Sequence, residues 1–123
     1  MIETKIETQI IKELKEVLDN KFAKDIVVLD ISDISVLSDY FIIVSADNEN
    51  QIKAIEEATE EYLSKNNLYL QHKDGLQRYT GKDRFLWSVL DFGSIMVHIF
   101  DKESRSFYQL ERLWADAGVV EIK

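Results

Sequence analysis

The feature that most constrains the fold is the run Tyr-Phe-Ile-Ile-Val-Ser at positions 40–45. Its apolar side chains are consecutive, whereas a strand with one wet face alternates apolar and polar residues. The run therefore predicts a strand that is covered on both faces. A second β-like segment, Asp25 to Ile31, precedes it, and the turn-forming pair Ser32-Asp33 follows that segment.

Two amphipathic helices accompany these strands. In residues 2–20 the apolar residues recur at spacings of three and four, which places them on one stripe of a helix. Residues 49–66 repeat the pattern, and Asn48 with Gln51 has the spacing of a capping box. The apolar stripe of the first helix consists of Ile2, Ile6, Ile10, Leu14, Val17 and Leu18, and that of the second consists of Ile52, Ile55, Ala58 (or Thr59) and Tyr62.

The second half of the chain adds short elements. Leu68 to Leu70 predicts a strand, and residues 71–84 form a polar segment with a net charge of +2. Strands are predicted at Phe85 to Leu90 and Ser94 to Phe100, joined by a tight turn in which Gly93 supplies a positive φ. A helix is predicted after Ser106, with Leu110, Leu113, Trp114 and Ala117 on its apolar side and Gly118 at its end.

The predicted order is α-β-β-α-β-β-β-α, which indicates an α/β fold with helices packed on a sheet. The strand–helix–strand unit from Tyr40 to Leu70 predicts a right-handed parallel crossover, and the later hairpin adds antiparallel pairing. We therefore expect a mixed sheet. No linker composition or repeat interrupts the chain, so residues 1–123 are expected to form one domain.

Charge and composition exclude several function classes. The net charge is −8, and the clustered Lys and Arg that grip phosphates are missing, so free nucleic acid is not an expected partner. Cysteine is absent, which excludes disulfides, thiol nucleophiles and Cys-based zinc sites. The longest apolar run, Phe41 to Val44, is too short for a membrane span, and the start lacks the pattern of a signal peptide. A cytoplasmic location and no membrane partner are expected.

Catalytic motifs are weak or missing. Ser38, His98 and either Asp39 or Asp91 could be combined into a triad, but no Gly-x-Ser-x-Gly elbow is present. The four glycines make no phosphate loop. Asp30, Asp33 and Asp39 could bind Mg²⁺, although capping of turns is the more common role of such residues. We expect no catalytic residue, no metal and no cofactor.

Aromatic and charged residues interleave in the second half, and Trp, Tyr and Arg dominate binding hot spots. Trp87 and Trp114 could instead be core residues. Phe92 lies in the turn between two strands, where an exposed docking contact is expected. For His98, in an apolar strand, a hydrogen-bonded core position is the default and docking is the alternative.

The sequence resembles the ribosomal silencing factor family, also called the Iojap family. The matching segments are Leu37–Ile43, Gln51–Ile55, Trp87–Gly93, Val97–Phe100 and Arg105–Ala117. The resemblance implies a fold akin to nucleotidyltransferases without their catalytic motif. It also implies a translational repressor that binds universal large-subunit protein fourteen on the large ribosomal subunit and sterically blocks joining with the small subunit.

The resemblance also implies a set of docking residues. Many relatives carry Tyr at the position of Phe92 and Arg at that of Asn50, so those contacts differ here. The residues carried over as partner-binding are Trp87, Asp91, Phe92, Gly93, His98, Arg105, Tyr108, Leu110, Glu111 and Trp114.

Two other hypotheses compete. One is a metal-dependent nucleotide-binding enzyme of nucleotidyltransferase-like fold, built on Asp30, Asp33 and Asp39. The other is a homodimer whose aromatic residues pair two copies.

Overall fold

The computed structural model describes residues 8–31, 38–80, 83–102, 105 and 120–122 of the chain. The described elements are α1 (Thr8–Asn20), β1 (Lys24–Asp30), β2 (Tyr40–Ala46), α2 (Glu49–Lys65), β3 (His72–Thr80), β4 (Asp83–Asp91), β5 (Ile95–Asp101) and β6 (Val120–Ile122). The α/β class is confirmed. Of the first predicted helix, the part from Thr8 onward is confirmed, and the predicted last helix lies outside the described residues.

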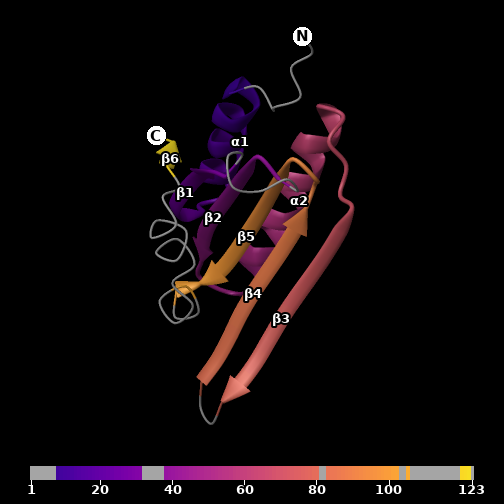
Figure 1. Ribbon diagram of the computed structural model, residues 1–123. Coiled ribbons are helices and arrows are strands. Elements are labelled where there is room, and N and C mark those ends of the chain that lie inside the picture. The colour runs from indigo at the N-terminus through magenta and orange to yellow at the C-terminus, as the bar shows by residue number, and fades with distance from the viewer. Residues whose placement is uncertain (1–7, 32–37, 81–82, 103–104, 106–119, 123) are drawn as a thin grey trace.

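The strands form one sheet in the order β3-β4-β5-β2-β1-β6 (Figure 1). β2 and β5 are parallel, whereas the other neighbouring pairs are antiparallel, so the predicted mixed sheet is confirmed. Because two antiparallel steps separate β5 from β3, β3 runs in the same direction as β2. The crossover through α2 thus joins parallel strands that are separated by β4 and β5.

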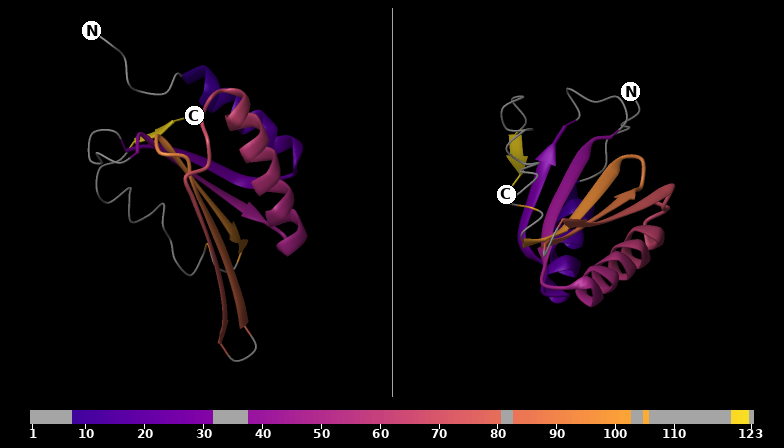
Figure 2. Two further views of the ribbon diagram at one scale, coloured as in Figure 1. Left: turned by 90° about the vertical axis from the view of Figure 1, so that its right-hand side faces the viewer. Right: turned by 90° about the horizontal axis from the view of Figure 1, so that it is seen from below.

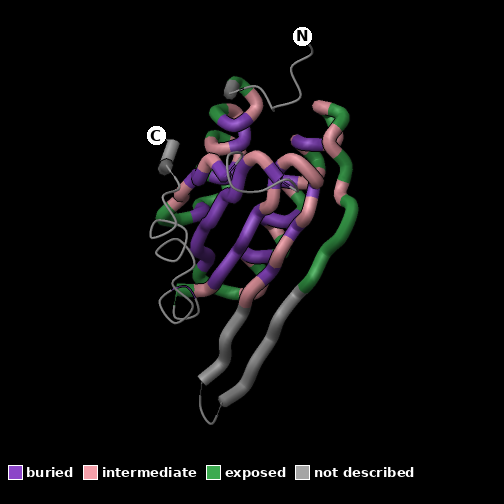
Figure 3. The backbone as a smooth tube through the Cα atoms, in the orientation of Figure 1, coloured by how far each residue is buried: buried purple, intermediate pink, exposed green. Residues whose placement is uncertain are grey.

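Both described helices cover the same face of the sheet (Figure 2). All seven residues of β2 are buried, as the consecutive apolar run predicted. Ile42 and Val44 face the helices and join the main core with Leu14, Ile55 and Leu63. Figure 3 shows that buried residues concentrate in the central strands. Among the described residues, no helix combines the length and the hydropathy that a membrane span requires.

The opposite face of the sheet carries a second apolar cluster, which contains Leu29, Phe41, Ile43 and Phe100, with Trp87 packed against it. The alternation of strand side chains explains the two clusters, since neighbouring residues of β2 and β5 point to opposite faces. We call this second surface the aromatic face.

The predicted strand at Leu68 to Leu70 is wrong. Asn67 has a φ of 64°, which turns the chain out of α2, and Leu68 then packs on the core from an irregular segment. The third strand is His72–Thr80, within the segment predicted only as polar, and its register with β4 runs from His72↔Asp91 to Thr80↔Asp83. An edge strand with an exposed start has no apolar alternation, so its sequence gave no β signal.

The start of α2 also ties two parts of the chain together. Asn48 Oδ1 accepts from the backbone N–H of Gln51 at 2.9 Å, as the capping prediction required. The reciprocal bond departs from the capping box, because Gln51 Oε1 accepts from Asp47 N–H and not from Asn48. Farther along α2, the Tyr62 hydroxyl donates to Glu13 Oε2 on α1 at 3.0 Å. Burial and the hydrogen bond to this carboxylate raise the pKa of Tyr62 to about 12.

Candidate docking surface

The predicted docking residues fall into three groups in the fold. Trp87 and His98 lie on β4 and β5, and their strand positions place them on the aromatic face. Asp91, Phe92 and Gly93 form the end of β4 and its connection to β5. Arg105 follows β5, whereas Tyr108, Leu110, Glu111 and Trp114 lie outside the described residues.

Trp87 and His98 are hydrogen-bonded side chains on adjacent strands. Trp87 Nε1–H donates to His98 Nδ1 at 3.2 Å, and the ring centroids are 5.9 Å apart. Trp87 also stacks on Phe100 with a centroid distance of 5.0 Å and an interplanar angle of 23°. The indole is therefore oriented by one hydrogen bond and one stacked ring.

The burial of His98 does not fit the docking role that the resemblance implies for this residue. The residue is only 5% exposed, which favours the default prediction of a hydrogen-bonded core histidine over docking. Burial lowers the pKa of His98 to about 4, so the ring is neutral at neutral pH. Its Nε2 is buried and has no hydrogen-bond partner within the described structure.

The expectation that Phe92 is exposed is wrong, since the side chain is 2% exposed and belongs to the main core. Its backbone N–H donates to Ile95 O at 2.9 Å, which closes the turn. The side-chain alternation of β4 continues through the turn: Leu90 and Phe92 both enter the core, whereas Asp91 between them does not. That period-two spacing was the sequence signal that could have located Phe92.

The connection after β4 is braced by its own residues, as the prediction for Gly93 required. Gly93 has a φ of 82°, a conformation that other residues rarely adopt. Its N–H donates to Asp91 Oδ1 at 2.8 Å. The amide of Gln71 lies so close that a Cβ at Gly93 would approach Gln71 Nε2 to 2.7 Å. We call residues Asp91–Ser94 the docking turn.

The segment before β2 braces the same turn from behind. Ser38 Oγ donates to Gly93 O at 2.6 Å. The backbone N–H groups of Asp39 and Tyr40 both donate to Ser94 O, at 2.8 and 3.1 Å. From the sequence, Ser38 was considered for a catalytic triad, and Asp39 for a triad, a metal site or the capping of turns; none of these predicted the bonds to residues 93 and 94.

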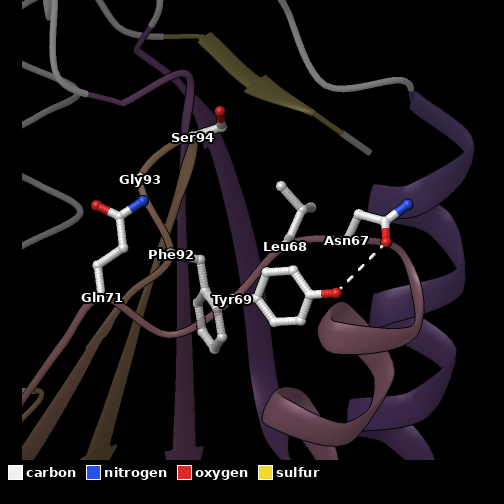
Figure 4. A pocket seen from close by; sticks show the side chains of 7 residues that line it. All are labelled: Asn67, Leu68, Tyr69, Gln71, Phe92, Gly93 and Ser94. Atoms are coloured by element: carbon white, nitrogen blue, oxygen red, sulfur yellow. Dashed lines mark hydrogen bonds between the residues drawn. The ribbon is translucent and has the colours of Figure 1, made fainter.

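A pocket of about 390 Å³ lies beside the docking turn. Figure 4 shows the rings of Tyr69 and Phe92 next to each other, with the Gln71 amide directed toward Gly93. Tyr69 is 61% exposed, and its hydroxyl lies 3.4 Å from Asn67 Oδ1. Tyr69 was not singled out from its sequence, because it was predicted to lie in a short strand. The pocket is lined by Asn67, Leu68, Tyr69, Gln71, Phe92, Gly93 and Ser94.

Arg105 is 9% exposed, and its guanidinium donates to Ser45 Oγ at 2.9 Å on β2. The bond ties the Arg105 side chain to β2. Its predicted role as a docking contact does not fit this burial.

The catalytic combinations are not assembled. His98 uses Nδ1 for Trp87, and its Nε2 has no partner in the described structure, so Ser38 makes no hydrogen bond to it. In the described parts of the chain, no three His, Asp or Glu side chains are grouped so that they could hold a metal ion. Asp33, one of the three proposed magnesium ligands, lies outside those parts.

Comparison with known proteins gives consistent results. The family model described as "Ribosomal silencing factor during starvation" matches residues 4–123. The ribosomal silencing factor RsfS of Bacillus subtilis is 34% identical over 104 residues, which cover 85% of this chain and 83% of that protein. A mouse protein named for mitochondrial assembly of the ribosomal large subunit is 32% identical and covers 82% of this chain, with 43% of its own length matched.

Among solved structures, a crystal structure from Chromobacterium violaceum superimposes with a TM-score of 0.75 and 27% identity. The match covers 89% of this chain and 88% of that one. The sheet and helices described above are therefore shared with that protein.

Proposed function

Since the chain belongs to the ribosomal silencing factor family, we propose that it is a translational repressor that binds the large ribosomal subunit. In this proposal it contacts universal large-subunit protein fourteen and sterically blocks joining with the small subunit. The family model supports ribosome-associated silencing, and the name of the mouse relative concerns the large subunit. Residues 1–123 act as one domain, and the mechanism needs occupancy of a surface and no catalysis.

The observation that carries the proposal is the bracing of the docking turn. Ser38 and Asp91 each form a hydrogen bond with the backbone of Gly93, and the Gln71 amide occupies the space that a Cβ at Gly93 would need. A surface that is ordered before binding loses less conformational entropy on association. The turn is thus suited to docking on another protein.

Trp87 and Asp91 provide the side chains of this surface. Both lie on β4 four positions apart, so they share the aromatic face, and both are half-buried. A Trp supplies a large contact area, and a carboxylate complements a basic partner. The docking contacts proposed here are Trp87, Asp91 and the backbone at Gly93, together with Tyr108, Leu110, Glu111 and Trp114 of the terminal segment.

Net charge supports the same partner class. The chain carries −8, and ribosomal proteins that lie against RNA are basic. Opposite charge accelerates encounter and adds specificity more than it adds affinity. The binding rate should therefore fall with rising salt.

The test is sedimentation of the protein with purified ribosomal subunits at low Mg²⁺, followed by subunit joining at raised Mg²⁺. We expect co-migration with the large subunit and fewer joined ribosomes. Protein that remains at the top of the gradient, with joining unchanged, contradicts the proposal.

A charge-matched pair of variants locates the surface. Asp91→Asn removes the charge but keeps the oxygen that accepts from Gly93, so the turn should persist. Glu57→Gln makes the same charge change at an exposed position on α2. We expect Asp91→Asn alone to weaken co-sedimentation; equal binding by both variants would remove Asp91 from the surface.

A homodimer that pairs two aromatic faces is a competing arrangement. Light scattering over a range of concentrations measures it directly. A dimer that dissociates when the large subunit is added would be a storage form of the same repressor.

A further inference from the structure

We propose that His98 is a positioning residue that fixes the indole of Trp87 in its docking orientation, and that it does not itself touch the ribosome. This inference rests on the proposed function. Its basis is the bond from Trp87 Nε1–H to His98 Nδ1, at 3.2 Å, combined with the burial of the imidazole.

The protonation state of the ring follows from that bond. An imidazole nitrogen that accepts a hydrogen bond carries no proton, so a neutral His98 has its proton on Nε2. That Nε2–H is buried and lacks a partner in the described residues. A buried donor without a partner is unfavourable, because it loses its bonds to water and gains none.

An apolar residue would avoid this loss. The neighbours Val97 and Ile99 are fully buried in the same strand, and position 98 packs against the Phe41 ring at a centroid distance of 4.8 Å. If position 98 served only to fill the core, Leu or Val would thus be sufficient there. The one hydrogen bond that the imidazole makes to a described residue is to the indole. Its distinctive contribution is therefore the orientation of Trp87.

The arrangement restrains the indole in two ways. Stacking on Phe100 fixes the plane of the ring, and the bond to His98 fixes which edge points into the strand pair. The bond also engages the single N–H of the indole. Trp87 therefore meets its partner through ring surface, which suits an aliphatic or cationic side chain and not a hydrogen-bond acceptor.

The test compares His98→Asn with His98→Leu. The two replacements have nearly the same shape, but only Asn can place an acceptor oxygen near the position of Nδ1. Three quantities are measured for each variant: binding to the large subunit by sedimentation, the indole N–H resonance of Trp87 by NMR, and the urea midpoint of unfolding. A Trp87→Phe variant assigns the resonance, since Trp114 provides the other indole.

We expect His98→Leu to unfold at an equal or higher urea concentration than the parent protein. Its Trp87 indole N–H should shift upfield and exchange faster, and its binding should weaken about tenfold, the usual scale for loss of one hydrogen bond. His98→Asn should retain most of the binding. Docking would then weaken without any loss of stability, which a purely structural role cannot produce.

Three results would overturn the inference. The first is unchanged binding by His98→Leu when the parent protein binds. The second is an unshifted Trp87 resonance in His98→Leu. The third is equal loss of binding in both variants, which would indicate general packing. Failure of the parent protein itself to bind the large subunit would reject the proposed function, and the inference with it.

Discussion

Gln51 on α2 donates its side-chain amide to the carbonyl oxygen of Phe22 at 2.8 Å, and to that of Lys21 at 3.2 Å. Phe22 has a φ of 62° and is 77% exposed, so an aromatic residue stands in the left-handed region at a surface turn. Such a conformation is strained and persists only when its surroundings enforce it. The Gln51 side chain supplies that constraint between the α1–β1 turn and the start of α2.

Gln51→Ala should therefore destabilise the protein by about 2 kcal/mol, since it removes the bonds from Asp47 and to the turn. Urea unfolding measures the change. Exposed Lys53→Ala on the same helix is the control, and it should leave stability within about 0.5 kcal/mol. Equal effects of the two changes would show that the turn is held without Gln51.

Gly93→Ala should cost about 1 kcal/mol or more, because a φ of 82° strains any residue that has a Cβ. The new Cβ would also meet Gln71 Nε2 at 2.7 Å, but that atom ends a flexible side chain and can move away. Adding Gln71→Ala should therefore recover only a small part of the loss. Full recovery in the double variant would instead assign the cost to the close approach.

Ser38→Ala should weaken binding to the large subunit while the fold persists. The change removes the bond from Ser38 Oγ to Gly93 O, worth about 1 kcal/mol, and loosens the docking turn from behind. Sedimentation at several concentrations of subunit measures the affinity. Ser64→Ala is a matched control, because its hydroxyl donates only within α2, to Glu61 O. Binding that is equal in both variants would contradict the bracing role.

Stability should fall in acid through His98. Burial lowers its pKa from 6.5 to about 4, so between these values the unfolded chain binds more protons than the folded chain. The contribution of His98 is complete above pH 6.5 and is lost as the pH falls through about 4, a change of about 3 kcal/mol. Between pH 7 and pH 4, the free energy of unfolding measured in urea should change less with pH in His98→Leu than in the parent protein. Identical pH profiles would mean that His98 is not buried as a neutral ring.

The local parts of the fold could be predicted because their signals are local. The consecutive apolar residues of β2 predict that both of its faces are buried, and the helical spacing of apolar residues in α2 predicts one buried face. The strand β3 could not be recognised, since its polar residues follow no alternation and its pairing is specified by β4. The segment Leu68 to Leu70 was wrongly predicted as a strand for the opposite reason. Its leucine side chains pack on the core, but its backbone does not pair with another strand.

The site was predicted less well than the fold, because its geometry depends on contacts between distant segments. The matched segments singled out the residues of the turn, yet Phe92 points into the core and Arg105 bonds to Ser45. The bonds from Ser38 and Asp39 to the turn span more than fifty positions of sequence, and no spacing rule reports them.

The parallel pairing of β2 with β5 has a consequence for how the protein is made. Its register joins Tyr40 to Ile95, so the centre of the sheet cannot close until most of the chain has been synthesised. The helical layer and the β1–β2 pair can form earlier from nearby residues. The turn at Asp91–Ser94 receives its hydrogen bonds from residues 38–40 only when β2 and β5 have paired. In the proposed function, a nascent or partly unfolded chain would therefore lack the assembled docking turn, and a chain would engage the large subunit only after β2 and β5 have paired.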